Sequence, residues 1–180
     1  MTDLTPITAL GGPAARVASF GSVSLTENTG LALASLAGAA DVAPMGLDLP
    51  PVGGAVSAGG YGAFWTGPSQ WMIEAAGRAE TDFAAALQAQ APDCVVTEQT
   101  DGFVCFEITA PGAGLTGLLQ KLVNLDPKTL GPGRAVRTGL EHMTVFLIRR
   151  SDTQLAVIGM RSLAETLWHA LSVAARRLED

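Results

Sequence analysis

Two kinds of hydrophobic spacing alternate along the chain and predict a mixture of strands and amphipathic helices. Residues 103–109 alternate between the two faces of a strand, with Val104, Phe106 and Ile108 on the apolar face. A core-facing helix is predicted after Pro111, where apolar residues recur at i, i+3, i+4, i+7 and i+8: Leu115, Leu118, Leu119, Leu122 and Val123. This is the clearest helical pattern in the sequence.

The C-terminal part predicts an antiparallel set of strands followed by a helix. Apolar, strand-like runs at 135–140, 143–148 and 154–159 are separated by short polar turns. Ser162 and Glu165 have the spacing of a capping box, so the last helix is expected to begin at Ser162. Its apolar face is expected to consist of five residues at helical spacing: Leu163, Leu167, Leu171, Ala174 and Leu178.

A β-hairpin is predicted in the middle of the chain. The runs GAFW and QWMIEA flank the turn residues 66–69, which places Trp65 opposite Trp71 and Ile73. A helix that ends before Pro92 is expected next, from apolar residues at i, i+4, i+7 and i+8: Ala79, Phe83, Ala86 and Leu87.

The N-terminal region gives weaker patterns. Residues 17–25 mix β-branched and small side chains and predict one strand, and the Ala-rich run 31–40 predicts a short helix. Residues 41–62 are rich in proline and glycine and show almost no periodicity, which predicts a long loop. Loops of this length are usually functional or mobile.

The two hairpin–helix units match each other at an offset of 84 residues, which places Gln70 on Gln154 and Phe83 on Leu167. Alanine- and leucine-rich helices also match by chance, so duplication and coincidence both remain open. Duplication implies two pseudo-duplicated halves within one domain, at about 15–95 and 96–180. We expect an α+β fold of ferredoxin-like βαβ units that share one antiparallel or mixed sheet, with helices packed on one side.

Composition limits the classes of protein that fit. The 180 residues are 48% hydrophobic and 16% charged, which is sufficient for one domain with a sizeable core. The net charge is −6 and no run of basic residues occurs, so nucleic acid is not expected as a partner. Cys94 and Cys105 are too few for a disulfide framework or a four-ligand zinc site.

Neither a membrane span nor an export signal is expected. Residues 49–73 contain no charge, but their prolines and glycines would leave backbone groups without hydrogen-bond partners in lipid. The N-terminus lacks the basic and then apolar pattern of a signal peptide. The protein is therefore expected to be cytoplasmic.

No residue set in the sequence predicts an enzyme that acts alone. The glycines at 59–62 lack the Lys-Ser/Thr of a phosphate loop, and Ser69 lacks the second glycine of a nucleophile elbow. His142 and His169 do not have metal-ligand spacing. Asp101, before a glycine, fits a turn better than a general base, and the strand residue Cys105 is expected to be a buried, inert thiol.

Aromatic side chains gather beside the predicted long loop and define a candidate interface or ligand patch. Its aromatic members are Tyr61, Phe64, Trp65 and Trp71, which would anchor a partner if exposed and fill the core if buried. Arg134 and Arg137 complete the candidate set. Their guanidinium groups would hold a carboxylate or phosphate of a partner or cofactor, or else be solvated.

Four segments together resemble one known family: GAFWTGPSQWMIEA, DGFVCFEITAPGAGLTGLLQKLVNLD, PGRAVRTGLEHMTVFLIRR and RSLAETLWHAL. In this order and spacing they are similar to the gamma subunits of heterotetrameric sarcosine oxidases, over about residues 60–178. The resemblance implies the fold of the folate-binding N-terminal region of aminomethyltransferases and of the N-terminal domain of tRNA-modifying GTPases.

The same resemblance implies a function within a complex that oxidises sarcosine to glycine in one-carbon metabolism. The expected partners are the alpha, beta and delta subunits. FAD, FMN, NAD, tetrahydrofolate and zinc are expected on those subunits, and this chain is expected to bind no cofactor and to carry no catalytic residue.

Two alternatives remain open at this stage. The chain could be a stand-alone protein that binds folate or another one-carbon ligand, with Tyr61, Trp65 and Trp71 stacking on a pterin. It could also be a homodimeric paralogue that buries its own aromatic patch.

Overall fold

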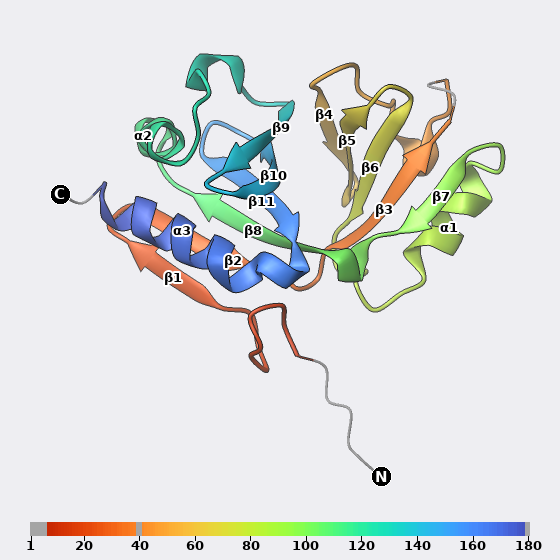
Figure 1. The fold of residues 1–180 in the computed structure, drawn as a ribbon. Helices are drawn as coiled ribbons and strands as arrows, with labels where there is room; N and C mark the ends of the chain where they lie inside the picture. The colour runs from red at the N-terminus through yellow and green to blue at the C-terminus, as the bar shows by residue number, and fades with distance from the viewer. Residues whose placement is uncertain (1–6, 39–40, 179–180) are drawn as a thin grey trace, which may run out of the picture.

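The computed structural model describes residues 7–38 and 41–178 of the chain (Figure 1). Its strands form two antiparallel sheets that lie beside each other. The six-stranded sheet has the order β1 (Val17–Phe20), β2 (Val23–Glu27), β8 (Phe103–Thr109), β11 (Gln154–Met160), β10 (Met143–Arg149) and β9 (Arg134–Leu140). The five-stranded sheet has the order β4 (Ala55–Ala58), β5 (Tyr61–Gly67), β6 (Gln70–Ala75), β3 (Ala32–Ala37) and β7 (Val95–Glu98).

Each sheet has its own helices. Figure 1 shows α2 (Gly112–Leu122) and α3 (Ala164–Arg176) beside the six-stranded sheet and α1 (Phe83–Gln90) beside β7 and β3 of the five-stranded sheet. The α+β class with antiparallel strands is therefore confirmed. The strands divide between two sheets, however, and do not share the single sheet expected from the sequence.

The core has three parts. One lies between the six-stranded sheet and helices α2 and α3, and a second lies between the five-stranded sheet and α1. The third lies where the two sheets face each other, and it is built from nine buried residues: Leu31, Leu33, Phe64, Met72, Cys105, Ala135, Ile148, Ala156 and Ile158. The two sheets thus form one packed structure through apolar contact between their inner faces.

Strong periodic patterns in the sequence correspond to the observed elements. Strand β8 covers the predicted residues, and Val104, Phe106 and Ile108 are buried as expected. Helix α2 buries Leu115, and its neighbours Leu118 and Leu119 are buried with it. The predicted hairpin is β5–β6, in which Trp65 pairs with Trp71.

Two N-terminal predictions are wrong. Residues 17–25 form two antiparallel strands joined by a turn at Gly21, whose positive φ of 53° suits glycine. Residues 32–37 form strand β3 and not a helix, because this segment pairs with β6 on one side and β7 on the other. Residues 39–40 of the predicted helix lie outside the described residues.

The predicted long loop also contains regular structure. Residues 44–46 form one short 3-10 turn, and strand β4 pairs with the start of β5. Gly54, the residue before β4, forms an isolated antiparallel bridge with Arg134 at the start of β9 in the other sheet. Backbone hydrogen bonds flank this bridge, from Ala55 N to Gly133 O at 2.8 Å and from Ala135 N to Gly53 O at 3.0 Å.

Two helix starts differ from the predictions. Helix α3 begins at Ala164, and Ser162 belongs to a preceding 3-10 turn in which no side chain caps the helix. The predicted capping box is therefore wrong. Helix α1 begins only at Phe83, because the Asp82 side chain caps it by accepting a hydrogen bond from Ala85 N at 3.0 Å.

The two sheets share a common strand arrangement. The order β4-β5-β6-β3 in one sheet corresponds to the order β9-β10-β11-β8 in the other. Along the chain, helix α1 follows β6 and helix α3 follows β11. Strands β6 and β11 begin at Gln70 and Gln154, the residues matched by the predicted offset. This arrangement is what duplication of two halves, at about 15–95 and 96–180, would produce. Duplication itself stays a prediction.

Candidate functional site

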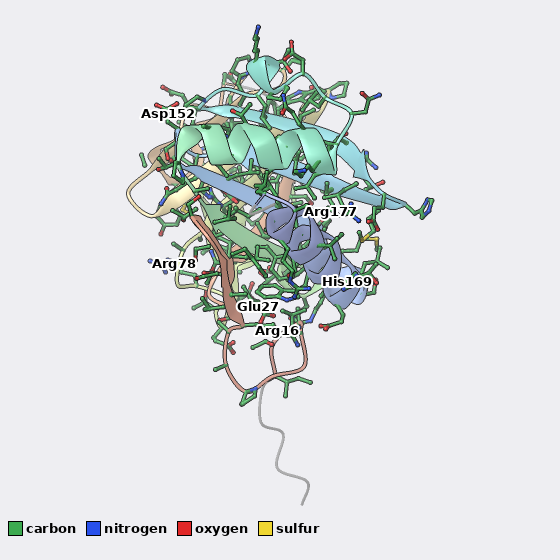
Figure 2. The ribbon with its side chains drawn as sticks, turned by 90° about the vertical axis from the view of Figure 1, so that its left-hand side faces the viewer. Arg16, Glu27, Arg78, Asp152, His169 and Arg177 are labelled. Carbon is green, nitrogen blue, oxygen red and sulfur yellow. The ribbon has the colours of Figure 1, made fainter. Side chains whose placement is uncertain are left out.

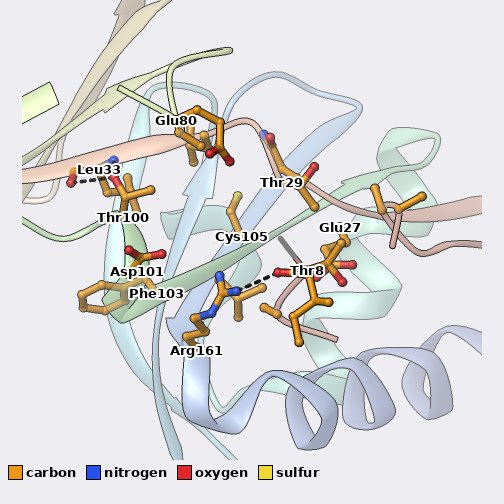
Figure 3. Close-up of a pocket in the computed structure, with 18 of the residues that line it drawn as sticks. Thr8, Glu27, Thr29, Leu33, Glu80, Thr100, Asp101, Phe103, Cys105 and Arg161 are labelled. Atoms are coloured by element: carbon orange, nitrogen blue, oxygen red, sulfur yellow. Dashed lines mark hydrogen bonds between the residues drawn. The ribbon is translucent and has the colours of Figure 1, made fainter. Parts of the chain in front are cut away.

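A cavity of about 460 Å³ lies where the chain crosses between the two sheets (Figure 3). The first crossing, at 28–31, connects β2 with β3, and the second, at 99–102, connects β7 with β8. Residues from both crossings line the cavity, among them Thr29 and Asp101. The site is therefore formed by the connections between sheets and not by one sheet alone.

An N-terminal segment, residues 7–16, covers one side of this cavity. The Glu27 carboxylate holds the segment by accepting hydrogen bonds from Leu10 N and Arg16 N, both at 3.1 Å. Figure 2 shows Arg16 and Glu27 close together at the base of the molecule. Glu27 is only 2% exposed, and these two backbone donors satisfy a carboxylate that would otherwise be costly to bury.

Two further charged contacts fix the covering segment. Arg16 donates to both carboxylate oxygens of Glu165 in α3, at 3.0 and 3.1 Å. Arg161, in the turn before α3, donates to the backbone carbonyl of Ile7 at 3.1 Å. The segment is thereby tied to β2 and to the start of α3.

Charged side chains of both signs point into the cavity. Figure 3 shows Glu80, Asp101 and Arg161 reaching into the same space from three separate segments. Within the described residues, no ion pair or hydrogen bond joins Arg161 to either carboxylate. The Phe103 ring adds an apolar wall.

Cys105 also lines the cavity, but it is not an activated nucleophile. Burial, together with the nearby charges of Glu107 and Glu74, raises the pKa of the Cys105 thiol well above its ordinary value. The thiol is therefore neutral at pH 7, as expected for the inert cysteine that the sequence predicts.

A second, more open cavity of about 500 Å³ lies beside the first and shares Asn28 and Leu31 with it. Arg150 lines it and links the two sheets. Its guanidinium donates to both carboxylate oxygens of Glu74 in β6 at 3.0 Å and to Glu107 in β8 at 3.0 to 3.1 Å. Burial opposes the charge on Arg150, but these two carboxylates outweigh it and raise the pKa of the guanidinium.

The structure divides the aromatic residues of the predicted patch between two parts of the core. Phe64 is fully buried between the sheets, while Tyr61, Trp65 and Trp71 contact the core beside α1. Trp71 is buried, and its indole N–H donates to the carbonyl of Pro50 at 2.8 Å. Of the four aromatic residues, Tyr61 is the one that lines a described cavity, the second one.

The two predicted arginines lie elsewhere, exposed on edge strand β9. Neither Arg134 nor Arg137 lines the two cavities. His142 and His169 are also exposed, and Figure 2 shows His169 on helix α3.

Of the charged residues that line the first cavity, Asp101 was considered from the sequence, but Glu27, Glu80 and Arg161 were not, nor was Glu74 of the second cavity. Glu27 lies on the face of β2 that also carries Val23 and Leu25, and Glu74 lies in the apolar run of β6, and both are unusual places for a carboxylate. That isolated charge was the available signal for both. Glu80 and Arg161 carry no such signal, since each lies in a polar connection outside a strand.

Two kinds of site are absent from the part of the chain that the structure describes. No three His, Cys, Asp or Glu side chains gather there in a way that could hold a metal ion. Over the same residues, no helix combines the length and the apolar composition that crossing a membrane requires.

Two comparisons by sequence find no match. No protein-family model matches the chain. No curated protein has a matching sequence.

Comparison by structure finds clear similarity to solved proteins. A chain of the heterotetrameric sarcosine oxidase from Corynebacterium sp. U-96, solved in complex with pyrrole 2-carboxylate, matches with a TM-score of 0.76 and 22% sequence identity. The match covers 91% of this chain and 89% of that one. The glycine cleavage system aminomethyltransferase T from Bartonella henselae matches with a TM-score of 0.61 and 17% identity, over 87% of this chain and 50% of that one.

These identities are low, so the similarity concerns the fold. The nearly equal coverages show that this chain and the matched sarcosine oxidase chain have similar lengths, whereas the match spans half of the aminomethyltransferase. The chain therefore has the α+β fold of one chain of a heterotetrameric sarcosine oxidase, a fold that also forms half of an aminomethyltransferase.

Proposed function

We propose that this chain is a non-catalytic, gamma-type subunit of a heterotetrameric sarcosine oxidase complex. The observation that carries the proposal is the structural match to a whole chain of such a complex, with about nine-tenths of both chains aligned. The four sequence segments that resemble gamma subunits support the same assignment. The complex would oxidise sarcosine to glycine in the cytoplasm.

In this proposal the redox chemistry belongs to the other subunits. FAD, FMN, NAD, tetrahydrofolate and zinc would be bound by the alpha, beta and delta subunits. The residues on the two cavities support this division of function, because the cysteine among them has a raised pKa and no histidine lines either cavity. A buried thiol whose pKa is raised stays in its neutral form, which is a poor nucleophile.

Purification of the tagged chain from its native cells tests the proposal. We expect three further chains to remain bound, a flavin absorbance spectrum, and sarcosine turnover by the assembled material. The separated chain should be colourless and inactive. Sarcosine turnover by the separated chain, or its recovery from native cells without partners, would contradict the proposal.

A stand-alone folate-binding protein is the alternative that the aminomethyltransferase match favours. The structure offers less for pterin stacking than expected, since Trp71 is buried and Trp65 lines neither cavity. Titration with tetrahydrofolate, followed by tryptophan fluorescence, would distinguish the alternative. Saturable quenching by the isolated chain would favour it over the subunit assignment.

A homodimeric paralogue remains the third candidate. The aromatic patch that motivated it is not a single exposed surface, because Phe64 and Trp71 are buried within the monomer. Sedimentation at several concentrations measures whether the isolated chain nevertheless self-associates.

A further inference from the structure

The first cavity is open to solvent on one side and presents separated charges of opposite sign, on the exposed Glu80 and Asp101 and the half-buried Arg161. Arg161 donates a hydrogen bond to the carbonyl of Ile7 and is paired with no carboxylate among the described residues. Glu80 and Asp101 face the same space without a cationic partner there (Figure 3).

We propose that this cavity binds a small zwitterion of the amino-acid class. The ligand carboxylate would lie against the Arg161 guanidinium, whose planar set of N–H donors matches a carboxylate. The ligand ammonium group would lie between Glu80 and Asp101. The proposal goes beyond the subunit function, and it concerns a property of the isolated chain.

Because the lining carries charges of both signs, it favours a ligand with a positive and a negative group over a simple anion or cation. An anion without an ammonium group would be repelled by Glu80 and Asp101, and a cation without a carboxylate would leave Arg161 unpaired. A metal ion fits poorly, because these carboxylates do not belong to any described group of three metal-binding side chains.

The remaining walls suit a small molecule with a short apolar part. The volume of about 460 Å³ lies within the range of small-ligand pockets. Phe103 supplies an apolar surface, and Thr29 supplies a hydroxyl group that can donate or accept. The buried Glu27 carboxylate already accepts one hydrogen bond on each oxygen, from Leu10 N and Arg16 N, so it has less acceptor capacity left for the ligand ammonium.

NMR titration of the full chain with three probes tests this assignment. Glycine carries both charges, acetate carries only the negative one, and methylamine carries only the positive one. We expect saturable shifts of the Thr29, Asp101 and Cys105 backbone amides with glycine, at a Kd on the order of 1 mM. Acetate and methylamine should produce no saturable shift at the same concentrations.

Variants that each remove one charge assign the two ends of the ligand. Asp101→Asn and Arg161→Met should each weaken glycine binding at least about tenfold, since each removes one charged partner. Asp93→Asn and Arg177→Met are matched controls, because both residues are exposed and outside the cavity. These controls should bind glycine as the unmodified chain does.

Three results would overturn the proposal. The first is the absence of saturable glycine shifts up to about 100 mM, a hundred times the expected Kd. The second is equal binding of acetate or methylamine, and the third is equal weakening by the control variants. Because Arg161→Met also removes the contact with Ile7, Arg161→Lys is measured beside it and should retain more glycine binding, since it keeps the positive charge; equal loss in both variants would count against the role of that charge.

Discussion

Helices α1 and α3 occupy corresponding places in the two sheets, but they are stabilised in different ways. Helix α3 has 13 residues, of which eight are buried, and no side chain caps its N-terminus. Helix α1 has eight residues and buries only Phe83 and Leu87, yet its first turn receives two side-chain caps. Asp82 accepts from Ala85 N, and Glu98 accepts from Ala84 N at 2.9 Å.

Side-chain hydrogen bonds also stabilise the C-terminal end of α1. The Gln88 amide group donates to the carbonyls of Ala91, Pro92 and Cys94, at 2.9 to 3.4 Å. The core beneath α1 contains many alanines and therefore offers less apolar area than the core beneath α3. The comparison indicates that capping and apolar burial compensate for each other at equivalent places in one fold.

The largest expected effects come from matched core truncations in the two helices. Leu171→Ala in α3 should lower the free energy of unfolding by about 4 kcal/mol, and Leu87→Ala in α1 by about 2 to 3 kcal/mol. Both leucines are buried, but the short α1 can shift to fill part of the resulting cavity. Urea denaturation measures both values, and a larger loss for Leu87→Ala would contradict the comparison.

Removing a cap should have a smaller effect, confined to α1. Asp82→Ala should cost about 1 kcal/mol, because Ala85 N loses its hydrogen-bond acceptor. Ser162→Ala is the matched control before α3, and it should change stability by less than about 0.5 kcal/mol, since Ser162 is exposed and caps nothing. Equal losses in both variants, measured by urea denaturation, would remove the distinction between the helices.

The smallest effect is a pH dependence that originates at Glu98. Burial alone would raise the pKa of Glu98, but hydrogen bonds from the Thr100 hydroxyl and from backbone N–H groups of Ala84, Thr100 and Gln99 lower it below the ordinary value of 4.5. A lowered pKa stabilises the fold above the pKa of the unfolded chain, and this contribution disappears as the pH falls through the folded value.

Glu98→Gln should therefore be less stable than the unmodified chain near pH 7, and the difference should shrink as the pH falls below 4.5. Unfolding measured at several pH values provides the comparison. A difference that stays constant down to pH 3 would show that the charge of Glu98 contributes nothing.

Much of the fold could be predicted wherever burial is confined to one face. Strand β8 and helix α2 have this property, so their apolar residues recur with the period of the element. Strand β3 lacks it, because four of its six residues are buried and lie on both faces of a central strand. Its alanines and leucines therefore resembled a helix.

The candidate site could not be predicted from sequence patterns. Glu80, Asp101 and Arg161 are separated along the chain, and they meet only because the chain crosses twice between the sheets. The aromatic residues gave a stronger signal, but Phe64 and Trp71 fill the interior. Aromatic side chains suit both cores and interfaces, so composition alone does not distinguish the two uses.

The hydrogen bonds between β4 and β9 affect how the protein can associate through its strands. An open sheet edge presents unpaired N–H and C=O groups to which a strand of another chain can add. Because β4 and β9 bond to each other around Gly54 and Arg134, each covers part of the other's edge. Among the described strands, the edges without such cover are β1 and β7, which lie on opposite sides of the molecule in Figure 1. Addition of a strand from another chain is therefore favoured at β1 and β7 and hindered where β4 and β9 meet.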